Sequence, residues 1–372
     1  MTSHQFGTAA GGTGAAGPVF AAIDLGTNNC RMLVARPMVG ETPRDPAHTD
    51  PTRPDPTRTE FRVIDSFSRI TRLGEGVSGT GRLSVDAMDR TIDALKCCAD
   101  KMGRRRVSAS RQVATEACRR AVNCAEFLDR VTHETGLSLE IISAHEEATL
   151  ALKGCAALLD FTMPYALIFD IGGGSTEVLF VHIGEDATLA VQGCISLPMG
   201  VVTVAEDCGG GDLCGRTYQA VCERVQKLLE GFEVAHGIRD KIAAGIVQMI
   251  GTSGTVTTLG GLHLGLERYD RAMVDGLTLD FQALHVISQG LCGKSLQQRA
   301  SEPCIGWQRA DLMLAGCAIL EAICHLWPVG QLKVADRGLR EGLLMDLIHP
   351  TTLRVEPGRM HPTPAVAPLS LS

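Results

Sequence analysis

The stretch Ala21-Ala-Ile-Asp-Leu-Gly-Thr-Asn-Asn29 has a counterpart later in the chain, Ile168-Phe-Asp-Ile-Gly-Gly-Gly-Ser-Thr-Glu177. Each is an apolar strand that ends in Asp, followed by glycine and small polar residues and then by a second apolar strand. This pattern predicts a β-hairpin with a tip of small residues. Glycine lets backbone N–H groups approach an anion, and the Asp of the incoming strand is placed to hold a metal ion against that anion. The two copies predict a duplicated fold with a phosphate clamp between its halves.

Composition is that of an ordinary globular protein, with 45% hydrophobic and 21% charged residues over 372 positions. This length accommodates two domains. No uninterrupted apolar stretch is long enough for a membrane span, and the N-terminal residues lack the features of a secretion signal. The 14 cysteines show no Cys-x-x-Cys and no zinc spacing, so we expect reduced core thiols in a cytoplasmic protein.

The formal charge of −7 repels polyanions, so a phosphate-binding function needs local clusters of arginine. Arg31, Arg72, Arg119 and Arg340 lie beside the motifs and are the candidates. The run Arg104-Arg105-Arg106 is interpreted as a solvated loop after a helix.

The pattern of elements divides the chain into two similar halves. Residues 1–18 and 350–372 are expected to be disordered, and the proline-rich segment 37–59 is expected to be a flexible insertion at a hairpin tip. Residues 19–160 form the first predicted domain, with three strands, helices from 85 and 123, a strand near 112–114 and a helix over 144–159. Residues 161–349 form the second, with strands near 166–170, 177–183 and 189–197, and later helices near 216–232, 253–264, 280–293, 309–327 and 338–348.

Seven ordered motifs are similar to those of the exopolyphosphatase/guanosine pentaphosphate phosphatase (Ppx/GppA) family, over roughly residues 19–349. They are Asp24–Arg31, Arg72–Gly76, Ala114–Arg119, Ile142–Ala148, Asp170–Glu177, Gly251–Thr255 and Asp336–Gly342. The resemblance implies an α/β fold, with two ribonuclease-H-like domains of the actin/sugar-kinase superfold and a cleft between them. The last helix is a candidate to pack back on the first domain. The chain looks like the short form, without a C-terminal helical extension.

The resemblance also implies catalytic residues. Glu147 matches the general base, and its neighbour Glu146 is the competing assignment. Adjacent helix residues point about 100° apart, so the two glutamates cannot serve equally. Asp170 matches a metal-binding position, and Glu177 matches a catalytic one. Asp170 and Glu177 stand on the two strands of one hairpin, so both can face one Mg²⁺, and Asp24 is the corresponding Asp of the first hairpin.

A larger set of residues is expected to bind the phosphates. The two tips contribute from opposite walls, a strand-to-helix turn adds an anion site, and three arginines match basic positions of the family. The set is Thr27, Asn28, Asn29, Arg31, Arg119, Gly172, Gly173, Gly174, Ser175, Thr176, Thr252, Ser253, Gly254, Thr255 and Arg340. The first tip departs from the family's common Gly-Ser-Asn-Ser form by carrying Thr27 and Asn29.

The function implied is hydrolysis of a terminal phosphoanhydride, with Mg²⁺, on inorganic polyphosphate or guanosine pentaphosphate, and polyphosphate is favoured slightly. No nucleic acid or membrane partner is expected, and a homodimer is one candidate assembly. The alternatives are a kinase of the same superfold and a non-catalytic regulator that binds guanosine tetra- or pentaphosphate. A Walker A reading of Gly293-Lys294-Ser295 is rejected because Ser288 stands where that motif needs glycine.

Overall fold

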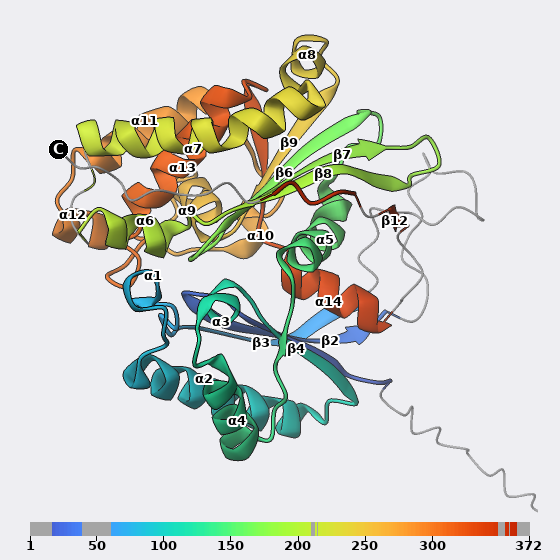
Figure 1. The fold of residues 1–372 in the computed structure, drawn as a ribbon. Helices are drawn as coiled ribbons and strands as arrows, with labels where there is room; N and C mark the ends of the chain where they lie inside the picture. Colours follow the sequence, from blue (N-terminus) through green and yellow to red (C-terminus); the bar gives the residue numbers. More distant parts are fainter. Residues whose placement is uncertain are drawn as a thin grey trace, which may run out of the picture.

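The computed structural model describes residues 17–38, 61–209, 213, 215–348, 354–356 and 358–362. It contains two β-sheets with helices packed on them, and two further helices lie between the sheets (Figure 1). The predicted N-terminal disorder and almost all of the predicted insertion fall outside the described residues. None of the helices in the described part of the chain is long and apolar enough to cross a membrane.

The first sheet has the strand order β3-β2-β1-β4-β5. Its strands are β1 (Phe20–Leu25), β2 (Asn29–Pro37), β3 (Phe61–Ile70), β4 (Ala109–Ala114) and β5 (Glu140–Ile141). The first three strands form an antiparallel meander, and β4 and β5 run parallel to β1. On one face α2 (Val85–Arg105) and α4 (Cys124–Thr135) enclose an apolar core with Ile23, Met32 and Phe127. Ser84 caps α2 by accepting the backbone N–H of Ala87, as its sequence predicts.

The second sheet repeats this plan and extends it at both edges. Its order is β10-β11-β9-β6-β7-β8-β12, in which β8-β7-β6-β9-β11 corresponds to the whole first sheet. The strands are β6 (Tyr165–Ile171), β7 (Thr176–Ile183), β8 (Leu189–Leu197), β9 (Val247–Thr252), β10 (Thr278–Asp280), β11 (Gln331–Ala335) and β12 (Val355–Glu356). The duplicated α/β architecture, two ribonuclease-H-like halves as in the actin/sugar-kinase superfold, is therefore present.

The helices of the second half are mostly the predicted ones, with shifted ends. They are α6 (Val201–Asp207), α7 (Arg216–His236), α8 (Ile238–Ala243), α9 (Gly254–His263), α10 (Arg271–Val274), α11 (Phe281–Cys292), α12 (Leu296–Ala300) and α13 (Met313–Leu326). The short helices α6, α8, α10 and α12, and in the first half α1 (Val77–Thr80) and α3 (Glu116–Arg120), were not predicted. Each spans at most two turns, too short for an apolar period to be read from the sequence. The cysteines in the described residues are all free.

Helices α5 (Ala144–Cys155) and α14 (Leu339–Ile348) lie side by side between the two sheets (Figure 1). Their backbones meet at two glycines, since a Cβ on Gly154 would overlap the carbonyl of Gly338, and one on Gly342 would overlap that of Leu150. Leu343 and Leu344 pack with residues of the first sheet, although α14 directly follows β11 of the second. This crossing places Arg337 and Gly338, just before α14, beside Gly154 and Cys155 at the end of α5.

One prediction for the C-terminal tail is wrong. Residues 354–356 and 358–362 lie along β8, where β12 pairs with it in parallel and the backbone N–H of His361 donates to Cys194 at 2.7 Å. The segment has prolines and no periodicity, but an unpaired sheet edge accepts backbone hydrogen bonds whatever the side chains are.

Candidate active site

A cavity between the two halves gathers most of the predicted site. It is lined by residues of both hairpins, α5, the start of α9 and the start of α14. The predicted residues in its lining are Asp24, Thr27, Asn28, Asn29, Arg31, Glu147, Asp170, Gly172, Gly173, Gly174, Ser175, Thr252, Ser253, Gly254, Thr255 and Arg340. Three predicted residues, Arg119, Thr176 and Glu177, are not in this lining.

The two hairpin tips meet face to face. Asp24 pairs with Arg31 across the first hairpin, and Asp170 pairs with Glu177 at the same position of the second. A Cβ on Gly173 would lie 3.0 Å from the backbone nitrogen of Asn28, and one on Gly174 would lie 2.6 Å from Oγ1 of Thr27. The second tip therefore needs glycine for its closeness to the first, because any side chain would push the tips apart.

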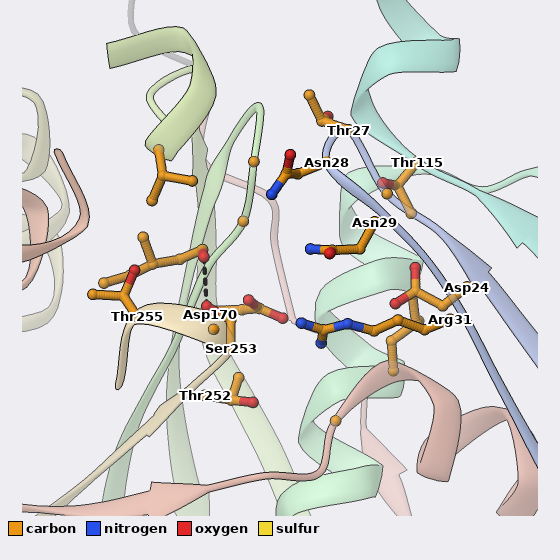
Figure 2. A pocket seen from close by; sticks show the side chains of 18 of the residues that line it. Asp24, Thr27, Asn28, Asn29, Arg31, Thr115, Asp170, Thr252, Ser253 and Thr255 are labelled. Atoms are coloured by element: carbon orange, nitrogen blue, oxygen red, sulfur yellow. Dashed lines mark hydrogen bonds between the residues drawn. The ribbon is translucent and has the colours of Figure 1, made fainter. Parts of the chain in front are cut away.

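Three polar atoms of the first tip are buried without hydrogen-bond partners among the residues that the structure describes. Thr27 Oγ1, Asn28 Oδ1 and Asn29 Oδ1 are buried and make no hydrogen bond within the described residues. Figure 2 shows Asn28 and Asn29 projecting toward Asp170 and Ser253. Since buried polar groups are nearly always satisfied, these atoms indicate a polar ligand.

The turn from β9 into α9 forms a second wall. Ser253 has φ +85°, a conformation that side chains rarely adopt, and its hydroxyl donates to the carbonyl of Ile171 (Figure 2). Thr252 Oγ1 donates to the carbonyl of Arg337 at 2.8 Å. These bonds fix the start of a ten-residue helix toward the cavity, an arrangement that favours anions.

Carboxylates are crowded in and around the cavity. Burial and the charge of Glu177 raise the pKa of Glu147 to about 8. Burial, together with Glu147 and Asp24, raises the pKa of Asp170 to about 7. Burial and then Asp170 raise the pKa of Glu177 to about 7, and burial also raises that of Asp24. Together these carboxylates form an excess of negative charge that a bound cation would relieve.

Glu147 and Glu146 have different surroundings. The carboxylate of Glu146 accepts from Arg111 at 2.5 Å, and its side chain is 39% exposed. Glu147 lines the cavity and accepts from Arg119 Nη1 at 2.8 Å, with 15% of its side chain exposed. Between these two residues, the structure places Glu147 in the site.

Arg119 is not placed as predicted. It lies behind Glu147 and also pairs with Glu116 at 3.0 Å, while Nη1 donates to the carbonyl of Ile142. Burial lowers the pKa of Arg119, but the negative charges of Glu147 and Glu116 have the larger effect, so the pKa of Arg119 is raised. Two carboxylates already engage the guanidinium, so its geometry is that of a support for Glu147 rather than of a free anion-binding group.

Two other predicted residues lie behind the second tip. Thr176 is fully buried, and its hydroxyl donates to the carbonyl of Met199 at 2.7 Å, which leaves no donor for phosphate. Glu177 is 2% exposed and accepts from Ser175 Oγ at 2.6 Å and from Ser196 Oγ at 2.8 Å.

Of the remaining arginine candidates, some line the cavity and others do not. The side chain of Arg31 extends from beside Asp24 toward Asp170 (Figure 2), and Arg340 lines the same cavity, where burial lowers its pKa. Arg72 is not in the lining and instead pairs with Asp311 at 2.9 Å. In the basic run at the end of α2, Arg105 pairs with Asp65.

Several lining residues were not predicted from the sequence. They include Thr115 and Glu116 after β4, Arg309, Leu312 and Met313 before and at the start of α13, and Asp336 and Arg337 before α14. Four of them lie inside two of the seven sequence motifs, so membership of a motif could have predicted that they line the cavity. These four are Thr115, Glu116, Asp336 and Arg337. No such pattern marks Arg309.

The carboxylate oxygens of the cavity fit a hard cation such as Mg²⁺ that the substrate phosphates also bind. Among the described residues, no group of three or more His, Cys, Asp or Glu side chains is arranged to hold a metal. Mg²⁺ is commonly bound through one or two carboxylates plus substrate phosphates and waters, and the carboxylates of Asp170 and Asp24, which both line the cavity, fit such a share.

Comparison with known proteins agrees with this geometry. The family model described as the Ppx/GppA phosphatase family matches residues 55–351. The chain belongs to this family. It is therefore a hydrolase by class.

Its relatives include enzymes of two names. Exopolyphosphatase 2 of Mycobacterium tuberculosis is 29% identical over 88% of this chain and 98% of its own length. A guanosine-5'-triphosphate,3'-diphosphate pyrophosphatase of Aeromonas hydrophila is 30% identical over 89% of this chain, which spans 60% of that enzyme. The crystal structure of a Ppx/GppA family member from Aquifex aeolicus has a TM-score of 0.64 and 29% identity, and the match covers 89% of this chain and 97% of that one.

Proposed function

We propose that this enzyme hydrolyses a terminal phosphoanhydride and releases orthophosphate from inorganic polyphosphate or guanosine pentaphosphate, with polyphosphate favoured. The observation that carries the proposal is the meeting of the two hairpin tips in the cavity that Glu147 and Asp170 line, with unpartnered side-chain oxygens on Thr27, Asn28 and Asn29. Polyphosphate is favoured because the match covers nearly the full length of an exopolyphosphatase but 60% of a guanosine-5'-triphosphate,3'-diphosphate pyrophosphatase.

The chain's own residues divide the work. Tip N–H groups, Asn28 and Asn29 hold the terminal phosphates, and Arg31 and Arg340 offset their charge. Mg²⁺, held by Asp170 with Asp24 nearby, would neutralise the charge that develops on the phosphoryl oxygens. These groups would orient the terminal phosphorus toward Glu147.

Glu147 would be the general base. A water attacks the terminal phosphorus and gives its proton to a carboxylate oxygen of Glu147, while the bond from phosphorus to the bridging oxygen breaks. The products are orthophosphate and a chain shortened by one phosphate. The ionised carboxylate is the form that accepts the proton. Burial raises the pKa of Glu147 to about 8 and disfavours that form, whereas the charge of Arg119 favours it.

A phosphate-release assay tests the proposal with polyphosphate, guanosine pentaphosphate and ATP side by side, with and without Mg²⁺. We expect release from one of the first two, abolished by a chelator. Glu147→Gln should reduce turnover by about 10²–10⁴ while polyphosphate binding is retained, because the amide keeps the size and loses the basicity.

Glu146→Gln is the matched control and should stay near the wild-type rate. Inactivity of Glu146→Gln with an active Glu147→Gln would reverse the assignment of the base. Binding of the phosphates without release by the wild-type enzyme would point to a non-catalytic binder, and transfer of phosphate to a sugar would point to a kinase.

A further inference from the structure

One tryptophan stands at the surface near the cavity. Trp307 is 65% exposed and is the only exposed aromatic side chain among the described residues. The chain's other tryptophan, Trp327, is completely buried, and its ring N–H donates to Glu233 at 2.7 Å. The exposed indole ring offers a large apolar face on which a planar ligand can stack.

Trp307 belongs to the segment that delivers Arg309 to the cavity. This segment joins α12 to α13 and makes a tight turn, in which the backbone N–H groups of Arg309 and Ala310 both donate to the carbonyl of Gly306 at 3.2 Å. Gly306 has φ +70°, which allows the turn. The exposed ring and the cavity-lining guanidinium are therefore two residues apart in one turn.

The same turn is hydrogen-bonded to Arg72 of the first half of the molecule. Arg72 Nη2 donates to the carbonyl of Gln308 at 3.3 Å and to the carboxylate of Asp311 at 2.9 Å. Trp307 thus belongs to a turn that contacts the first half of the molecule and that also carries the cavity-lining Arg309.

An aromatic face near a cavity that four arginines help to line suits a ligand with a planar base and a phosphate chain. We infer that Trp307 is the stacking surface for the purine base of a nucleotide whose phosphates enter the cavity, and that it separates guanosine pentaphosphate from base-free polyphosphate. The inference rests on the proposed function for the phosphate part of the site. Base stacking on an aromatic side chain adds affinity that a bare polyphosphate chain cannot gain.

Tryptophan fluorescence reports on this contact directly. Trp327 is sealed in the core and supplies a constant background, so a change in emission on ligand binding comes from Trp307. Guanosine tetraphosphate should quench the emission saturably, and inorganic tripolyphosphate should not. Trp307→Phe should abolish the quenching, and Val234→Ala, an exposed site on α7, should not.

Calorimetric affinities of the same two probes give the second measurement. Trp307→Ala should reduce the preference for guanosine tetraphosphate over tripolyphosphate by about 5- to 150-fold, which corresponds to ~1–3 kcal/mol per stacked base. Trp307→Phe should restore most of the preference, because phenylalanine also stacks.

An unchanged preference in Trp307→Ala, or equal quenching by both probes, would overturn the inference. The outcome is separate from that of the proposed function, since neither binding measurement requires turnover. If tripolyphosphate and guanosine tetraphosphate both fail to bind the wild-type protein, the phosphate site itself is wrong and the inference falls with it.

Discussion

At the scale of single residues, Arg119 changes its predicted role most. The sequence places it among the groups that grip the phosphate chain, but in the structure it holds Glu147 and Glu116. Its charge lowers the pKa of Glu147, against the effect of burial. Arg119 is thus a positioning residue that keeps the proposed base oriented and partly ionised.

Replacing Arg119 should therefore affect turnover more than substrate binding. Arg119→Ala should lower kcat by about tenfold or more, and should move the acidic limb of the kcat–pH profile to higher pH, because the pKa of Glu147 rises without the guanidinium. Arg119→Lys should restore part of both. A rise in KM at unchanged kcat and unchanged pH profile would return Arg119 to the substrate-binding set.

Asp65 gives a prediction for stability against pH. Hydrogen bonds from Lys101 and Arg105 lower the pKa of Asp65 to about 2, below the ordinary value near 3.9. The folded-state pKa is the lower one, so this stabilisation is present above pH ~4 and is lost as pH falls toward ~2.

Urea unfolding of Asp65→Asn should show a loss of about 1 kcal/mol in unfolding free energy at pH 7, discounted for partial solvent exposure. The loss should be smaller at pH 3. Asp93→Asn, whose side chain is 70% exposed, is the control and should change stability little at either pH. An equal loss for Asp65→Asn at both pH values would mean that the ion pairs do not stabilise the fold.

At the scale of elements, the crossing of α5 and α14 couples packing to the site. Gly154 allows the backbone of Gly338 to lie against α5, and this contact sets the position of Arg337, Gly338 and Arg340 in the cavity wall. A methyl group at position 154 would displace the start of α14.

Gly154→Ala should lower the unfolding free energy by about 1–3 kcal/mol, as overpacked contacts do, and should also reduce activity. Gly231→Ala, in the middle of α7 with open space around it, is the matched control and should be neutral or stabilising by about 0.5–1 kcal/mol. Thermal unfolding and phosphate release check both variants. A fully stable and active Gly154→Ala would show that the two helices can slide apart without affecting the site.

At the scale of the whole molecule, charge is distributed unevenly. The chain has a formal charge of −7, yet Arg31, Arg309, Arg337 and Arg340 all contribute to the cavity wall. A polyanion is therefore repelled by the average surface, and the arginines of the cavity wall supply the local positive charge that offsets this repulsion.

Binding of polyphosphate should consequently weaken as salt is added, because exposed charge contacts are screened beyond ~8–10 Å near physiological ionic strength. Arg340→Ala should raise KM for polyphosphate and make it less dependent on NaCl concentration. Measurement of KM across a salt series, with Arg104→Ala as a remote control, tests this expectation. A KM that does not respond to salt would exclude electrostatic capture by these arginines.

The sequence by itself determined the duplicated hairpins, the α/β architecture and most of the residues in the cavity wall. Those features depend on local sequence pattern. Two apolar strands joined by a short tip of glycine and small polar residues form a hairpin, and the spacing of seven residues places Asp170 and Glu177 on its two strands. The pairing of Asp170 with Glu177 follows from that spacing alone.

Only the tertiary structure decided which of two adjacent glutamates faces the cavity, and that Arg309, which lies outside the sequence motifs, does so too. The motif favours Glu147 over its neighbour Glu146, but only the structure shows that Glu147 lines the cavity and pairs with Arg119, whereas Glu146 pairs with Arg111. The position of α14, the docking of β12 and the entry of Arg309 all depend on contacts between segments far apart in the chain. Such contacts arise from complementary surfaces and free backbone groups, which leave no periodic signal in the sequence.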